Sequence, residues 1–222
     1  MPRIDRVAED LFQLHGRPHH AVNVYLAGDV LIDAGTSGDR QRILSQLAGR
    51  TVSAHALTHA HPDHYGSSHA VCEQLGIPLW CGERDANVAE GERPAPGKGR
   101  AARLLDRLPA PQPHPVARRL TEGDQVGSFT VLDVPGHSPG HVAYWRESDR
   151  TLICGDVLFN LSLPTLQPGL REPYGMLTAD PLRNRDSARR LAELRPNLIL
   201  FGHGPPLRDG ESFVRFVESL PA

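Results

Sequence analysis

Cysteine is scarce in this sequence. The chain has only three cysteines in 222 residues, at Cys72, Cys81 and Cys154, and no two of them form a CxxC pair. Such an odd and sparse set argues against a disulfide framework and against a zinc site built from cysteine. We therefore expect free thiols in a reducing compartment.

Long apolar runs are also missing. No stretch of the sequence is apolar over the length that crosses a bilayer. The first residues, MPRIDRVAEDLFQL, lack the basic patch and apolar core of an export signal. Together these absences predict a cytoplasmic protein that does not span a membrane.

An excess of positive charge is absent as well. The chain carries 24 lysines and arginines against 26 aspartates and glutamates, a formal net charge of -2. Without a basic field, it has no general means of collecting nucleic acid or anionic membrane surfaces. We expect a small-molecule substrate, no nucleic-acid partner and no membrane partner, while the oligomeric state stays open.

Histidine, glycine and proline are plentiful, with 12, 21 and 20 residues respectively, which favours many turns and a metal site over long helices. The length fits a single domain spanning residues 1–222. Within it, residues 84–115 are rich in proline, glycine and arginine. This stretch predicts a surface excursion, either a lid or a solvated loop without a role.

Short apolar strands and amphipathic helices alternate along the chain. Strands are predicted at residues 22–27, 30–35, 54–59, 78–81, 114–120, 129–135, 141–145, 151–156 and 197–202. Helices are predicted at 37–50 behind a Ser37 cap, at 66–76 with Gly76 as the stop, at 180–195 after Asp180, and near the end of the chain. The pattern predicts an α+β fold with two stacked sheets and helices outside, a four-layer αβ/βα sandwich.

Residues 58–64 read THAHPDH, a density of nitrogen and oxygen donors that core packing rarely produces. His59 and His61 are two residues apart, so an extended strand end would point both imidazoles to one side. Pro62 then bends the chain, which lets Asp63 and His64 arrive from a turn. The segment therefore predicts two groups of ligands that face one cleft.

Three further donors each follow an apolar strand: His137 in VPGHSPGH, Asp156 in LICGD and His203 in LILFGHG. A lone histidine or aspartate at such a place is commonly a turn former or a satisfied hydrogen-bonding group. Seven together favour a metal site, because strand ends meet at the rim of a sheet, where pockets form. Five imidazoles and two carboxylates without a thiolate suit two divalent ions, most readily Zn²⁺, with iron or manganese as alternatives.

With these segments the sequence resembles the metallo-β-lactamase superfamily, whose HxHxDH hallmark is matched by HAHPDH at 59–64. LIDAG, GHSPGH, GDVLF and FGHGPP resemble its other ligand-bearing segments, in the same order. The resemblance implies the metallo-β-lactamase fold and assigns every ligand. It gives His59, His61 and His137 to a first metal, Asp63, His64 and His203 to a second, and Asp156 to a bridge between them.

Two further positions are weighed against the family pattern. Asp33, in LIDAG, matches a residue beneath the site that orients a ligand imidazole, although an ordinary turn aspartate before Gly35 explains it equally well. His141 lies four residues after His137, but the family does not use that position, and we leave it out of the ligand set.

The implied chemistry is hydrolysis, in which a hydroxide shared by the two ions attacks a carbonyl. Asp63 would orient that hydroxide and pass its proton to the leaving group. Tyr174 and Tyr65 are candidate donors to the oxyanion or the substrate, although each also suits plain packing.

The segment GDVLF is similar to that of glyoxalase II, which favours a thioester, with an ester or lactone as neighbours in chemistry. Phe159 stands where quorum-lactone hydrolases carry a tyrosine, which argues against that type of lactonase. The alternatives are an iron-dependent oxidoreductase of persulfide dioxygenase type, a phosphodiesterase, and a metal-stabilised binding protein without catalysis.

Overall fold

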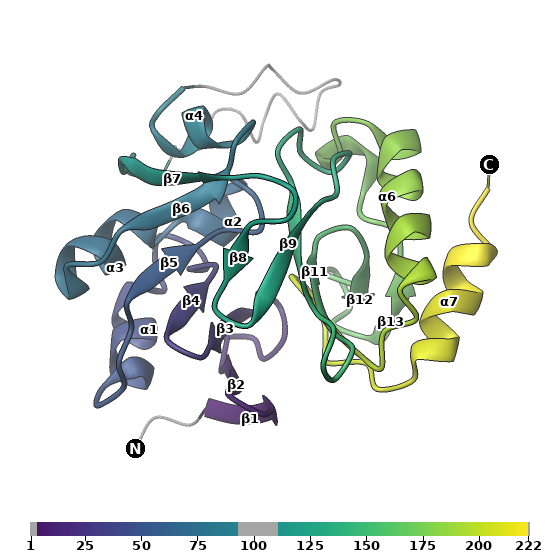
Figure 1. The fold of residues 1–222 in the computed structure, drawn as a ribbon, viewed down its shortest axis with the longest axis horizontal. Helices are drawn as coiled ribbons and strands as arrows, with labels where there is room; N and C mark the ends of the chain where they lie inside the picture. The colour runs from purple at the N-terminus through teal and green to yellow at the C-terminus, as the bar shows by residue number, and fades with distance from the viewer. Residues whose placement is uncertain (1–3, 93–110, 222) are drawn as a thin grey trace.

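The computed structural model describes residues 4–92 and 111–221. Within them, a seven-stranded and a five-stranded sheet lie between two sets of helices (Figure 1). In that view α1 and α3 flank one side of the molecule, and α6 and α7 flank the other. The predicted α+β four-layer sandwich is confirmed.

The first sheet follows chain order from β1 to β7. Its four N-terminal strands pair antiparallel, and each later strand pairs parallel with the one before it. Its strands are β1 (Ile4–Ala8), β2 (Leu11–Leu14), β3 (Val24–Ala27), β4 (Val30–Ile32), β5 (Ala54–Ala56), β6 (Leu79–Gly82) and β7 (Val116–Leu120).

The second sheet has the order β14-β11-β10-β9-β8, and only β11 and β14 pair parallel. Its strands are β8 (Gln125–Val126), β9 (Phe129–Asp133), β10 (Val142–Arg146), β11 (Thr151–Gly155) and β14 (Leu198–Phe201). A separate hairpin joins β12 (Phe159–Leu161) to β13 (Pro168–Arg171).

The core between the sheets is built from apolar side chains of strands in both sheets. Tyr25, Val131, Tyr144, Ile153 and Leu200 are almost fully buried in one cluster with side chains from both sheets. Full burial of an aliphatic side chain contributes about 1.5–3 kcal/mol. The two sheets are therefore held rigidly, and the loops at their rim have a fixed base.

The helices cover the outer faces with apolar stripes. Ile43 and Val71 pack with the outer side of the first sheet, while Leu191, Phe213 and Val217 pack with that of the second. The helices are α1 (Arg40–Leu47), α2 (Pro62–Tyr65), α3 (Ser68–Leu75), α4 (Ala86–Ala89), α6 (Pro181–Glu193) and α7 (Gly210–Glu218), with a 3-10 turn at Gly175–Leu177. No helix of the described residues is long and apolar enough to cross a membrane.

Helix ends test the capping predictions. Gly76 ends α3 in the left-handed conformation, and the Asp180 side chain accepts a hydrogen bond from the Arg183 backbone N–H at the start of α6, both as predicted. The Ser37 cap is wrong. The Asp39 carboxylate accepts hydrogen bonds from the Thr36 backbone N–H and hydroxyl, which closes a turn and moves the helix start to Arg40.

The predicted excursion at residues 84–115 lies only partly within the described residues. Its first part forms the short helix α4, and β7 begins just after its end. Residues 93–110 lie outside the described residues. The single-domain assignment and a lid role stay predictions.

Candidate metal centre

The structure brings all seven predicted ligand side chains to one place. They arrive from segments that follow β5, β9, β11 and β14, and from the single turn of α2. The seven are His59, His61, Asp63, His64, His137, Asp156 and His203.

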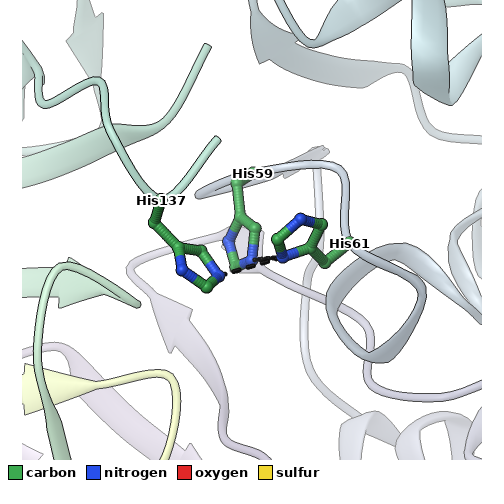
Figure 2. A group of neighbouring side chains, drawn as sticks. All are labelled: His59, His61 and His137. Carbon is green, nitrogen blue, oxygen red and sulfur yellow. Dashed lines mark hydrogen bonds between the residues drawn. The ribbon is translucent and has the colours of Figure 1, made fainter. Parts of the chain in front are cut away.

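The first group consists of three imidazoles whose nitrogens converge (Figure 2). His59 Nε2 lies 3.1 Å from His61 Nδ1, which lies 2.9 Å from His137 Nε2. The rings of His61 and His137 stand at 79° to each other, so their edges rather than their faces meet. Three ring nitrogens at this spacing can bind one ion between them.

The second group combines a carboxylate with two imidazoles. Asp63 Oδ2 lies 3.8 Å from His64 Nε2 and 3.4 Å from His203 Nε2, and the two nitrogens are 3.4 Å apart. Asp63 and His64 come from α2, whereas His203 follows β14 on the other sheet. The group therefore depends on how the two sheets pack.

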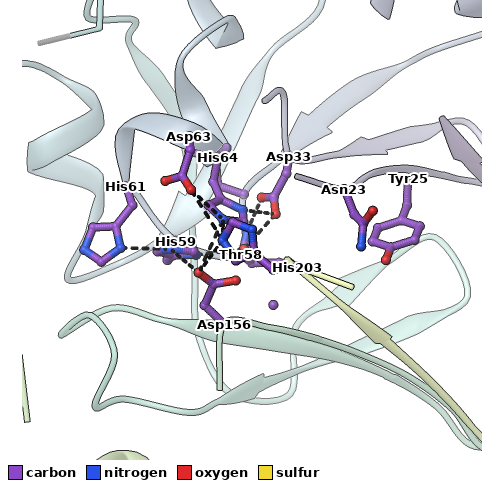
Figure 3. A network of polar contacts seen from close by, with 12 residues as sticks. Asn23, Tyr25, Asp33, Thr58, His59, His61, Asp63, His64, Asp156 and His203 are labelled. Atoms are coloured by element: carbon purple, nitrogen blue, oxygen red, sulfur yellow. Dashed lines mark hydrogen bonds and ion pairs between the residues drawn. The ribbon is translucent and has the colours of Figure 1, made fainter. Parts of the chain in front are cut away.

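Asp156 joins the two groups (Figure 3). Its Oδ2 atom lies 3.4 Å from His137 Nε2 in the first group, and 3.4 and 3.1 Å from the Nε2 atoms of His64 and His203 in the second. Its other oxygen, Oδ1, is buried and has no hydrogen-bond partner in the described part of the chain. One carboxylate oxygen, Oδ2, thus faces nitrogens of both groups, and a cation held by either group could contact it.

In the imidazoles of His64, His137 and His203 the second ring nitrogen is hydrogen-bonded to a group outside the ligand set. His64 Nδ1 donates to Asp33 Oδ2 over 2.9 Å, and His203 Nδ1 donates to the backbone oxygen of Ala21. His137 Nδ1 lies 3.2 Å from the Thr178 hydroxyl, which itself donates to a backbone oxygen and so accepts from the ring. Since Nδ1 is hydrogen-bonded away from the site in all three rings, Nε2 is the atom of each that faces it.

Asp33 is held at the base of the site in a left-handed backbone conformation, with φ of 60°. Its carboxylate accepts hydrogen bonds from the Thr58 backbone N–H, the Thr58 hydroxyl and His64 Nδ1, each over 2.8–2.9 Å. The Thr58 hydroxyl in turn lies 3.0 Å from His59 Nδ1. Asp33 therefore supports one imidazole of each group, one directly and one through Thr58.

Burial and neighbouring charge give the histidines different pKa values. Burial lowers the pKa of His61 to about 3 and that of His59 well below 6.5, and adjacent imidazoles add to both shifts. Burial alone would also lower the pKa of His203 and His64, yet Asp156 outweighs it and raises them, to about 10 for His203. Burial would raise the pKa of Asp156, but His203 and His64 hold it well below 3.8. A buried anion among imidazole nitrogens is a strong ligand for a cation.

The expected strand end at His59 and His61 is wrong. Strand β5 ends at Ala56, and the two histidines follow it in an irregular segment. The reason is that side chains take the backbone donors: Asp33 accepts from the Thr58 N–H, and Asp85 accepts from the Ala60 N–H over 3.0 Å. The imidazoles nevertheless meet, because these carboxylates shape the loop.

His141 lies outside both groups but beneath Asp156. Its Nε2 accepts a hydrogen bond from the Asp156 backbone N–H over 3.0 Å, and its ring stacks on His59 at 4.7 Å. Burial lowers its pKa well below 6.5, with help from His137, so the ring is neutral. This position fits the omission of His141 from the predicted ligand set, whereas its contact with Asp156 was not predicted. The second histidine of GHSPGH was the available signal.

The two tyrosines occupy different settings. Tyr65 is buried in an apolar cluster with Leu57 and Cys72, which favours packing over contact with a substrate. The Tyr174 ring lies 6.1 Å from the ring of Phe159, which in turn lies 4.6 Å from the ring of His203. Tyr174 therefore borders the site, whereas Tyr65 packs in the apolar core beside it.

Gly202 allows the closest approach within the site. A Cβ on Gly202 would lie 1.9 Å from Asp156 Oδ1 and 2.7 Å from His64 Cε1. Neither distance is compatible with a side chain, since non-bonded carbon atoms rest about 3.5–4.0 Å apart. A glycine immediately before His203 is therefore required for Asp156 to reach both groups.

Comparisons with known proteins point to one family. The sequence profile of the Metallo-beta-lactamase superfamily matches residues 17–203. The chain is 32% identical over 190 residues to the Bacillus subtilis protein named "Probable metallo-hydrolase YybB", covering 83% of this chain and 80% of that protein. It is 28% identical to a hydroxyacylglutathione hydrolase of Bdellovibrio bacteriovorus, covering 78% of this chain and 56% of that protein. A solved structure of TTHA1623 in a di-iron-bound form is similar, with a TM-score of 0.62, 31% identity and 94% of each chain covered.

Proposed function

Because this chain belongs to the metallo-beta-lactamase superfamily, we propose that it is a dinuclear metal-dependent hydrolase of small-molecule carbonyl compounds. The resemblance to this superfamily that the sequence indicated is confirmed, and the chain is a metal-dependent hydrolase of that family. Thioesters, esters and lactones are the substrate classes that we propose. The observation that carries the proposal is that Asp156 Oδ2 lies within 3.8 Å of imidazole nitrogens from both three-donor groups.

The residues present fit a pair of divalent ions. The first ion would be held by His59, His61 and His137, the second by Asp63, His64 and His203, with Asp156 between them. Nitrogen and oxygen donors without thiolate suit zinc, and they also accept iron or manganese. The burial of the Asp156 carboxylate and the approach of three Nε2 atoms to its Oδ2 are features that a bound cation would explain.

When bound, two such ions lower the pKa of a water molecule and polarise a substrate oxygen. The remaining work falls to the protein. Asp63 is 38% exposed and therefore contacts both the site and solvent. Burial alone would raise its pKa, but His64 and His203 lower it, so Asp63 is a carboxylate at neutral pH. It can accept a hydrogen bond from the attacking water and pass the proton to the leaving oxygen or sulfur.

Cleavage of a carbonyl compound is favoured by the relatives and by the wall of the site. One relative is named for hydrolysis of a hydroxyacylglutathione, a thioester. Beside the two ligand groups, the rings of Phe159 and Tyr174 form an aromatic edge next to His137 and His203. The Phe159 ring is buried, so the partly exposed Tyr174 ring is the part of this edge that an acyl group could contact.

The test is a substrate screen on protein of known metal content. Protein stripped of metal and reloaded with zinc, iron or manganese is assayed against acyl thioesters, esters, lactones and phosphodiesters. Two ions per chain with turnover of a carbonyl substrate support the proposal. One iron per chain with oxygen consumption on a persulfide indicates the oxidoreductase alternative, turnover of phosphodiesters alone indicates a phosphodiesterase, and metal without turnover indicates a binding protein.

Two variants test the roles of single residues. His61→Ala removes a nitrogen of the first group, so metal content and turnover should both fall. Asp63→Asn keeps the side-chain volume but removes the proton acceptor, so turnover should fall far more than the free energy of unfolding. Equal losses of turnover and stability in Asp63→Asn would argue for a purely structural role.

A further inference from the structure

Asp85 lies at the start of the predicted excursion, outside both ligand groups, yet it connects the two loops that carry the first group. Its side chain is buried. Its carboxylate accepts hydrogen bonds from the Ala60 N–H over 3.0 Å, the Ser138 hydroxyl over 2.5 Å and the Gly140 N–H over 2.6 Å. Ala60 lies between His59 and His61 in the sequence, and Ser138 directly follows His137.

We propose that Asp85 is a positioning residue that sets the spacing of His59, His61 and His137, and with it the metal affinity of the first group. It touches neither ion nor substrate. The inference rests on the proposed metal centre and adds a residue to it that neither the HxHxDH segment nor the GHSPGH segment contains.

Two glycines also allow the backbone around Asp85 to pack closely on the loop that bears His137. A Cβ on Gly140 would lie 2.3 Å from the Asp85 backbone nitrogen, and one on Gly82 would lie 2.1 Å from the Gly140 backbone oxygen. The turn between β6 and α4 therefore packs directly on the loop that bears His137. At so close a contact, a small shift of the Asp85 carboxylate moves the histidine loop with it.

The charge of Asp85 is matched by hydrogen bonds alone. In residues 4–92 and 111–221 no cationic side chain forms an ion pair with it, so three donors from the two loops hold the carboxylate. Hydrogen bonds to a charged acceptor are about twice as strong as neutral ones. In a variant without this carboxylate, the three donors would lose their common acceptor. The two loops would then no longer be connected through the side chain of Asp85.

A merely structural aspartate would affect both metal sites and overall stability together, so the experiment separates the sites. Asp85→Asn is introduced into His203→Ala, which retains the first group, and into His61→Ala, which retains the second. Zinc affinity is measured by competition with a chromophoric chelator. Partners of metal ligands typically change metal affinity about 10–100-fold. We expect a loss of about tenfold or more in the first background and less than twofold in the second.

Asp124→Asn is the matched control, because Asp124 also accepts from a backbone N–H, a hydroxyl and a further donor, but on the β7–β8 turn away from the site. It should leave zinc affinity unchanged in both backgrounds. Ser138→Ala removes only one of the three donors and keeps the inference testable if Asp85→Asn does not fold, with a smaller loss confined to the first group.

Equal losses in both backgrounds, or no loss in either, would overturn the positioning role of Asp85. Failure of the metal centre itself has a different signature. If the chain without substitutions binds no zinc, the proposed centre is wrong. If it binds two zinc ions and Asp85→Asn changes neither affinity, only the positioning role of Asp85 is wrong.

Discussion

The Thr58 hydroxyl donates a hydrogen bond to Asp33 Oδ2 over 2.8 Å and lies 3.0 Å from His59 Nδ1. Since its proton is used toward Asp33, the hydroxyl oxygen accepts from the imidazole. The pair fixes His59 with Nδ1 protonated and Nε2 free, and it ties His59 to the same carboxylate that holds His64. One aspartate thereby orients ligands of both proposed metal sites.

Thr58→Val tests this relay, because valine has nearly the same shape but no hydroxyl. It leaves the Asp33 carboxylate one donor short and frees the His59 ring to choose the other tautomer. We expect zinc affinity of the first group to fall about tenfold, the lower end of the range for partners of metal ligands. Chelator competition measures it.

Thr58→Ser is the control for that variant. Serine keeps the hydroxyl and loses only a methyl group, so zinc affinity should stay within about twofold of the original chain while stability falls slightly. If serine and valine weaken zinc binding equally, the methyl group rather than the hydroxyl supports His59, and the relay is wrong.

Gly202→Ala tests the close approach beneath the site. The added methyl group would overlap Asp156 Oδ1 and His64 Cε1. Overpacking of this kind typically costs about 1–3 kcal/mol, and the displaced Asp156 could no longer reach both groups. We expect less than two zinc ions per chain and a lower melting temperature. Gly175→Ala is the control, since a Cβ there meets nothing within 4 Å; comparable zinc loss in both variants would contradict the steric argument.

The sequence predicted the layers of the fold because apolar periodicity reports burial directly. Leu198–Phe201 reads as a buried strand, and it is one. The first residue of a helix depends on which nearby side chain binds the free backbone N–H groups. The sequence therefore indicated a cap at Ser37, whereas Asp39 closes the turn in the structure. His137 and His203 were recognisable because each follows an apolar strand in a glycine-containing segment.

The residues that support the ligands were harder to find from the sequence. Asp85 stands in a stretch of arginine, glycine and proline, and its partners are backbone N–H groups 25 and 55 residues away along the chain. Nearly every residue has a backbone N–H, so no sequence pattern indicates which of these groups bind Asp85. Thr58 and Gly202 were quoted beside ligands, but their roles depend on contacts that only the folded chain reveals.

Metal removal gives the broadest prediction. An ion that binds the folded chain and not the unfolded one adds about 2.7 kcal/mol at a concentration 100 times its dissociation constant. For a chain of this size, that corresponds to a rise of about 5–10 °C in melting temperature. Treatment with a chelator should lower the melting temperature by this order, and added zinc should restore it. His61→Ala and His203→Ala should each show a smaller shift on adding zinc; a full shift in either would contradict the ligand assignment.

Asp39 provides a pH prediction away from the metal centre. Burial alone would raise its pKa, but hydrogen bonds from Arg42 and Thr36 outweigh burial and lower it below the usual 3.8. A carboxyl group whose pKa is lowered by folding stabilises the chain above the pKa of the unfolded state, and this stability is lost as pH falls through the folded value. Asp39→Asn should therefore lower the free energy of unfolding by about 1–2 kcal/mol at pH 6, and by progressively less below about pH 4.

Urea unfolding of both proteins at pH 6, 4 and 3 measures the difference. Asp186→Asn, at an exposed pair with Arg189, should change little at any pH. A difference for Asp39→Asn that stays constant or grows toward acid would show that the charge of Asp39 does not hold the turn.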